Sequence, residues 1–125
     1  MKALPFWFFA VAVILAIIGM GVGIYMGISE DHALAPAHAH NNLLGWVTMA
    51  LYGTYYKLVP AAGRSRLAQV HFWLAFAGAV TIGLGIALAA QGQSLLVQVS
   101  SLLVIVAMVL FGYIVWTHRA GLALD

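Results

Sequence analysis

Four long apolar stretches alternate with short polar ones along this chain, at residues 4–28, 38–59, 67–90 and 95–117. The segments between them, SEDHALAPA, PAAGRSR and QGQS, contain the Pro, Gly or charged residues that commonly interrupt helices. A helix needs roughly 20 apolar residues to cross the hydrocarbon core of a bilayer, so each stretch is long enough to span it. The first stretch is about twice as long as the apolar region of a signal peptide, and we expect it to be retained. The pattern predicts an all-α integral membrane four-helix bundle, with residues 1–125 as a single four-span domain.

Composition agrees with this interpretation and excludes other classes of protein. Of the 125 residues, 65% are hydrophobic and 6% are charged, whereas about a quarter of a soluble domain is charged. These values exclude a soluble enzyme and also a disordered chain, which needs low hydrophobicity and high charge. The absence of Cys from the sequence excludes a disulfide scaffold, an iron–sulfur cluster and a Cys nucleophile. A net charge of +2 provides no basic stripe for nucleic acid.

The charged residues predict an orientation in the membrane. With four spans, all the basic residues lie on one side and Glu30 and Asp31 lie on the other; the basic residues are Lys2, Lys57, Arg64, Arg66 and Arg119. Cytoplasmic loops of membrane proteins carry an excess of Lys and Arg. We therefore expect a multi-pass protein of the cytoplasmic (inner) membrane with its N- and C-termini inside.

Glycines recur at close spacing in two of the predicted spans. Gly19, Gly23 and Gly27 form a GxxxG row in the first span, and Gly78, Gly83 and Gly85 lie in the third. Such small residues allow two helices to approach closely. The pattern is equally compatible with packing inside one chain and with oligomerisation.

Histidines are the strongest chemical signal in a chain with so few polar groups. Three of the five, His32, His38 and His40, lie within DHALAPAHAH at the outer end of the second span. Residues two apart on an α-helix are separated by about 200°, so His38 and His40 point to opposite flanks and cannot easily chelate one ion. Each can instead serve a separate site, and imidazole suits iron and copper. The alternative, that water in the headgroup region satisfies both rings, stays open.

The other histidines have simpler expected roles. His71 follows the opposite turn, far from His40 in depth, so we expect an interfacial residue hydrogen-bonded to a neighbouring helix. His118, beside Arg119, is expected at the solvated edge. His32 follows Glu30 and Asp31 and belongs either to an ordinary polar loop or to a cation site, with copper as the candidate metal on His32, His38 and His40.

The second span resembles part of a known family. The matching residues are Ala37-His38-Ala39-His40, Gly45, Gly53, Tyr55-Tyr56 and Pro60, which resemble helix X of subunit I of the haem–copper oxidases. The segment 69–73 with Gly78 is similar to the start of the following helix in that subunit. The resemblance covers about a third of the chain, residues 38–78, and the first and last spans match by topology only.

The resemblance implies a fold, a cofactor and an assembly. Subunit I has twelve helices in three arcs, and this chain resembles the single arc of helices IX–XII, so a homotrimer would resemble the whole subunit. In the family the first histidine of the HxH pair ligates one haem and the second ligates the haem in the next pore. By this resemblance His38 and His40 are ligands of haem b in an inter-subunit site, with copper as a further candidate.

Neighbouring residues have candidate supporting roles. Asn41 and Asn42 either orient an imidazole or a haem propionate, or hydrate the helix end. Trp46 is either an interfacial anchor or a group that stacks on the cofactor.

The departures from the family limit the chemistry. The three further histidines of the family's copper site have no equivalents in the other spans, and no acidic residue lies inside a span to relay protons. We therefore do not expect proton-pumping oxygen reduction, and no catalytic residue is predicted. The remaining polar side chains inside the spans are expected to make helix-to-helix hydrogen bonds; they are Thr48, Thr54, Thr81, Gln98 and Ser100.

The predicted function is therefore haem binding in the membrane, for electron transfer or for binding a diatomic gas such as O2 or NO. Two alternatives from other classes stay open. The chain is either a non-catalytic partner or assembly subunit of a respiratory oxidase, or a copper-handling membrane protein.

Overall fold

The computed structural model describes residue 1 and residues 3–123, which are helical with short connections and contain no strand. The elements in chain order are α1 (Leu4–Ser29), α2 (Ala35–His40), η1 (Asn41–Val47), α3 (Thr48–Leu58), α4 (Pro60–Gly63), α5 (Arg66–Ala89), α6 (Leu95–Thr117) and η2 (Arg119–Leu122). This confirms the all-α prediction. The basic residue Lys2, used in the orientation argument, lies outside the described residues.

Three helices, α1, α5 and α6, are long and apolar enough to cross a membrane. Residues 35–58, where the second span is predicted, are also helical throughout, but a π-helix, η1, separates α2 from α3. The helical residues begin at Ala35, before the predicted start at 38, because Pro36 lies in the first turn, where its missing N–H is not needed. The assignment of these residues as a fourth span stays a prediction.

Local sequence signals explain where the other long helices begin and end. Pro5 lies in the first turn of α1, and this helix ends where Glu30 adopts a left-handed conformation with φ 56°. Ser65 caps α5, because its side-chain oxygen accepts a hydrogen bond of 3.1 Å from the backbone N–H of Ala68.

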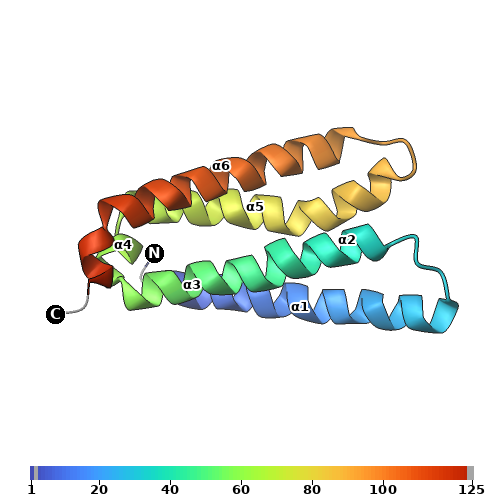
Figure 1. The fold of residues 1–125 in the computed structure, drawn as a ribbon, viewed down its shortest axis with the longest axis horizontal. Helices are drawn as coiled ribbons and strands as arrows, with labels where there is room; N and C mark the ends of the chain where they lie inside the picture. The colour runs from blue at the N-terminus through green and yellow to red at the C-terminus, as the bar shows by residue number, and fades with distance from the viewer. Residues whose placement is uncertain (2, 124–125) are drawn as a thin grey trace.

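The helices form two antiparallel pairs (Figure 1). In the first pair, α1 lies along η1 and α3, and in the second, α5 lies along α6. The turn that contains α4 connects the two pairs, at the end of the molecule where both termini lie (Figure 1). The other end carries the two remaining connections, residues 30–34 and 90–94.

The charged residues separate between these two ends as predicted. Glu30 and Asp31 follow α1 at one end, and the four described basic residues belong to the α4 end or to the helix ends beside it; these are Lys57, Arg64, Arg66 and Arg119 (Figure 1). The bundle is therefore electrically polarised along its length.

Glycines allow the close approach of α5 and α6. A Cβ on Gly85 would lie 2.9 Å from the backbone Cα and N of Val97, and one on Gly78 would lie 2.9 Å from Cγ2 of Val104. The buried Ser100 adds a polar contact, because its Oγ lies 2.8 Å from Oγ1 of Thr81. This bond confirms the predicted helix-to-helix role for Thr81 and Ser100.

The same prediction is wrong for three other polar side chains. Thr48, Thr54 and Gln98 bond instead within their own helical run, to the carbonyl of Leu43, the carbonyl of Ala50 and the hydroxyl of Ser94. The hydroxyls of Thr48 and Thr54 reach a carbonyl of their own preceding turn, and the longer amide of Gln98 reaches the hydroxyl four residues earlier, so none of them needs a partner on another helix.

The glycine row of α1 is used mainly inside the chain. A Cβ on Gly19 would overlap Oδ1 of Asn42, and one on Gly23 would lie 3.1 Å from the imidazole of His38. Only Gly27 of this row faces open space. Packing within one chain therefore accounts for Gly19 and Gly23.

The outer surface of the helices is apolar. Large hydrophobic side chains such as Ile28 and Trp116 are 82% and 72% exposed. A soluble protein would not expose so many large apolar side chains over whole helices. This surface and the three long apolar helices indicate a lipid bilayer as the environment.

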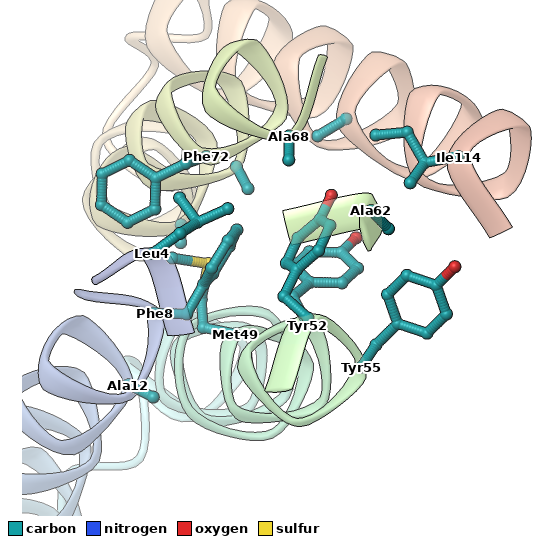
Figure 2. Close-up of a cluster of buried hydrophobic side chains, with 14 of the residues drawn as sticks. Leu4, Phe8, Ala12, Met49, Tyr52, Tyr55, Ala62, Ala68, Phe72 and Ile114 are labelled. Atoms are coloured by element: carbon teal, nitrogen blue, oxygen red, sulfur yellow. The ribbon is translucent and has the colours of Figure 1, made fainter. Parts of the chain in front are cut away.

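The interior core lies towards the α4 end (Figure 2). Helices α1, α3, α5 and α6 contribute to it; its larger buried side chains include Leu4, Phe8 and Leu15 from α1, Met49, Tyr52, Tyr55 and Tyr56 from α3, Phe72 from α5 and Ile114 from α6. Aromatic rings meet edge to face in this core, as with Phe8 and Phe72 at 5.0 Å between centroids.

The close approach of α5 and α6 can be tested with a single methyl group. We expect Gly85→Ala to destabilise the protein by about 1–3 kcal/mol, because the new Cβ meets backbone atoms of Val97 that cannot rotate away. The measurement is reversible unfolding in detergent followed by circular dichroism. Gly112→Ala in α6, where nothing lies within 4 Å, is the matched control, and equal stability of the two variants would contradict this packing.

Candidate functional site

The two histidines of α2 line different grooves. His38 borders a groove of about 260 Å³ between α1, α2 and α5, whose other walls include Ile18, Val22 and Leu84. His40 borders a groove of about 330 Å³ between η1, α5 and α6, whose walls include Ile86 and Val97. The predicted placement on opposite flanks is therefore confirmed.

The groove beside His40 is almost entirely apolar. Its other lining residues are Leu44, Ile82, Ile86, Val97, Ser101, Val104 and Ile105, so Ser101 is the only polar one beside the histidine. A hydrated ion has few polar partners there, whereas such walls suit an apolar ligand.

The imidazole of His40 has its Nδ1 held by the backbone, and its Nε2 has no hydrogen-bond partner among the described residues. Its Nδ1 lies 2.8 Å from the carbonyl oxygen of Pro36, one turn earlier on the helix, and the side chain is exposed. A carbonyl only accepts hydrogen bonds, so Nδ1 donates this one, and in the uncharged form of imidazole that does so the lone pair is on Nε2. Histidines that ligate metals usually have their second nitrogen fixed by a carbonyl in this way.

The imidazole of His38 is half-buried and is held from two sides. The amide nitrogen of Asn42 lies 3.1 Å from Nε2 of His38, and the ring packs on Gly23 of α1. Asn42 therefore contacts an imidazole, as one of its two predicted roles requires. Asn41 instead donates a 2.8 Å hydrogen bond to the carbonyl of Leu15 in α1, a role that the sequence did not suggest.

The π-helix η1 begins immediately after His40 and was not predicted. Short π-helical segments inside α-helices are frequent at functional sites. Within η1, Asn41, Asn42 and Gly45 all face α1, where a Cβ on Gly45 would lie 2.9 Å from the side chain of Leu15. The only hint in the sequence is the pair of adjacent amides, Asn41-Asn42, in an apolar stretch.

The structure does not form the suggested copper site. Among the described residues no three His, Asp or Glu side chains come together in a group that could hold a metal ion. His32 is exposed in the loop after α1, where its Nδ1 lies 3.2 Å from the carbonyl of Glu30, while His38 and His40 face different grooves. The three histidines therefore cannot act as one ligand set within one chain.

Trp46 lies one to two turns after His40 but lines neither groove. Its side chain is 38% exposed at the surface. Within one chain this position suits an interfacial anchor better than a group stacked on a ligand beside His38 or His40.

Apart from the two histidines of α2, a second cluster of polar side chains lies in the aromatic core and consists of His71, Tyr52, Tyr55 and Tyr56. The side chain of His71 is 0% exposed, and its Nδ1 lies 2.9 Å from the hydroxyl of Tyr56 in α3. The ring stacks on Phe111 at 5.3 Å and meets the edge of Tyr52 at 4.4 Å between centroids. The predicted hydrogen bond to a neighbouring helix is confirmed, and side chains of α1, α3 and α6 cover the ring. Its interfacial position in the membrane stays a prediction.

Two polar atoms of this second cluster have no partner among the described residues: Nε2 of His71 and the hydroxyl of Tyr55. Tyr52 and Tyr56, four residues apart, share one face of α3 and both contact His71. That spacing, together with a histidine at the same depth of the next long helix, is the signal from which this cluster could have been predicted.

Comparisons with protein-family models, with curated proteins and with solved structures find no match to this chain. The resemblance of residues 38–78 to haem–copper oxidases therefore stays a hypothesis that depends on the residues themselves.

The second cluster offers a comparison between adjacent tyrosines. We expect Tyr56→Phe to destabilise the protein by about 1 kcal/mol, because it leaves the buried imidazole of His71 without its hydrogen bond. Tyr55→Phe, which removes a buried hydroxyl that has no partner among the described residues, is expected to be neutral or stabilising. Unfolding in detergent measures both, and an equal loss in the two variants would argue against the Tyr56–His71 bond.

Proposed function

We propose that this protein binds haem b in the membrane through His38 and His40, for electron transfer or for binding a diatomic gas. One observation carries the proposal. The two imidazoles of α2 face separate apolar grooves on opposite flanks of one helix, and Nε2 of His40 is free to coordinate.

The donor set suits this group. Imidazole nitrogen is a common axial ligand of haem iron, and apolar walls suit the porphyrin ring. His40 would coordinate through Nε2 while Pro36 holds the ring in place. His38 would coordinate once the amide of Asn42 turns from Nε2, and Asn42 would then be available to orient the ring or a polar group of the ligand.

The size of the two grooves also supports a proposal about how copies of this protein assemble. Their volumes are about 260 and 330 Å³, so the first lies below the range typical of ligand sites and the second at its small end, and each groove lies at the surface of a single chain. We therefore propose that a second copy closes each site, so that His38 of one protomer and His40 of its neighbour face the same ligand. A homotrimer is the simplest closed assembly in agreement with the resemblance to one oxidase arc.

The number of imidazole ligands decides the chemistry. Haem supplies a one-electron redox centre, and an open axial position supplies a binding site for a small gas molecule. If His38 and His40 both ligate, no position stays open and electron transfer is favoured. If only His40 ligates, as its free Nε2 allows, a gas such as O2 or NO can bind on the other side.

The proposal includes a membrane orientation. Residues 35–58 would form a fourth span beside α1, α5 and α6, and the basic α4 end would face the cytoplasm across the inner membrane. The histidines of α2 would then lie near the outer face, where partners of a respiratory chain exchange electrons.

Absorption spectra of the purified protein test the proposal. We expect a haem Soret band that His38→Ala and His40→Ala each abolish or shift by loss of an axial ligand. His118→Ala is the matched control, because Nδ1 of His118 lies 3.0 Å from the carbonyl oxygen of Ile114 one turn earlier, just as Nδ1 of His40 lies 2.8 Å from that of Pro36. It should leave the spectrum unchanged, because His118 lies at the opposite end of the bundle and lines neither groove.

Carbon monoxide added to the reduced protein reports whether an axial position is open. A spectral change on its addition would favour gas binding, and no change would favour electron transfer. No Soret band from a folded, helical preparation, with or without added haem, would contradict the proposal. A haem band unaffected in both the His38 and the His40 variant would contradict the assignment of the ligands.

A further inference from the structure

A pocket of about 340 Å³ lies at the α4 end of the bundle, away from the histidines of α2. Its lining joins the start of α1 to the turn between α3 and α5, and consists of Met1, Leu4, Pro5, Tyr56, Lys57, Pro60, Gly63 and Arg64. Two basic side chains, those of Lys57 and Arg64, therefore line a pocket whose other walls are mainly apolar.

The turn around α4 brings the two basic residues to one pocket. After α3 ends at Leu58, the chain reverses through hydrogen bonds from Gly63 N to the carbonyl of Val59, 3.2 Å, and from Arg64 N to that of Pro60, 3.1 Å. Gly63 allows the turn to close on α3, since a Cβ there would lie 3.2 Å from the backbone oxygen of Tyr56. Lys57 and Arg64, seven positions apart in sequence, consequently border the same space.

The charges of the pocket are not balanced by nearby acidic residues in the part of the chain that the structure describes. Lys57 and Arg64 are both exposed, and the described acidic residues, Glu30 and Asp31, lie at the opposite end of the bundle (Figure 1). Arg66 and Arg119 add positive charge at the α4 end. The pocket is therefore complementary to an anion.

The position of the pocket indicates where that anion comes from. The pocket lies where α1 starts and α3 ends. The same first turns of α1 carry the exposed side chains of Phe6 and Trp7, and Trp is enriched at the level of lipid headgroups. Basic pockets between membrane helices bind the headgroups of anionic lipids. We propose that Lys57 and Arg64 bind the phosphate of an anionic phospholipid, with its glycerol and first acyl carbons against Leu4, Pro5 and Pro60.

The test measures which lipid stays with the protein. The full chain is reconstituted in vesicles of phosphatidylcholine containing roughly one-fifth phosphatidylglycerol, extracted in mild detergent, and analysed for bound lipid by mass spectrometry. We expect phosphatidylglycerol to be enriched on the unmodified protein, and Lys57→Gln/Arg64→Gln to reduce this enrichment about tenfold.

The double variant Arg66→Gln/Arg119→Gln is the matched control, because it removes the same charge at the same end from residues outside the pocket. We expect it to change the enrichment by less than about twofold. An equal loss in the two double variants would show general surface attraction and would overturn the proposal. So would an unmodified protein that shows no enrichment.

A measurement on the unmodified protein does not depend on the folding of any variant. We expect the melting temperature to be higher in vesicles with phosphatidylglycerol than in phosphatidylcholine alone, because a ligand of the folded state stabilises it. Inorganic phosphate added to phosphatidylcholine vesicles should give no such rise. An equal rise with inorganic phosphate would show a site for the free anion and would overturn the assignment to lipid, and no rise with phosphatidylglycerol would overturn the site.

Discussion

Close packing between α1 and residues 35–58 sets the directions of both histidines of α2. Asn41 bonds to the backbone of α1, and Asn42 fills the space that the missing side chain of Gly19 leaves. This contact fixes the rotation of the helix about its axis, so His38 faces the groove beside α1 and His40 faces the one beside α6. In a bilayer, where apolar side chains gain little by leaving lipid, such close contacts and buried amide bonds hold helices together.

The π-helix η1 is part of this contact between α1 and residues 35–58. It places two amides and a glycine on the side that faces α1, directly after the two histidines. A π-helical turn is less favourable than an α-helical one, so it persists where surrounding contacts compensate. Here the hydrogen bond from Asn41 to Leu15 and the fit of Asn42 on Gly19 provide those contacts.

The two ends of the bundle have different chemistry. One end carries the acidic loop and the imidazoles of α2, and the other carries the described basic residues and the aromatic core around His71. The buried His71–Tyr56 pair stabilises the core at the basic end, while Tyr56 also lines the pocket with Lys57. Lipid binding there and ligand binding at His38 and His40 would therefore occur at sites separated by the length of the helices.

The sequence by itself determined the helical class, the position of the helices to within about three residues, and the opposite flanks of His38 and His40. These follow from local rules: apolar length, helix-breaking residues and the rotation per residue of a helix. Only the tertiary structure decided that Gly19 and Gly23 pack within the chain, that η1 is a π-helix, and that His71 is buried against Tyr56. Those features depend on which faces of neighbouring helices meet, and in a chain that is apolar on all sides the hydrophobic pattern does not mark the inward face.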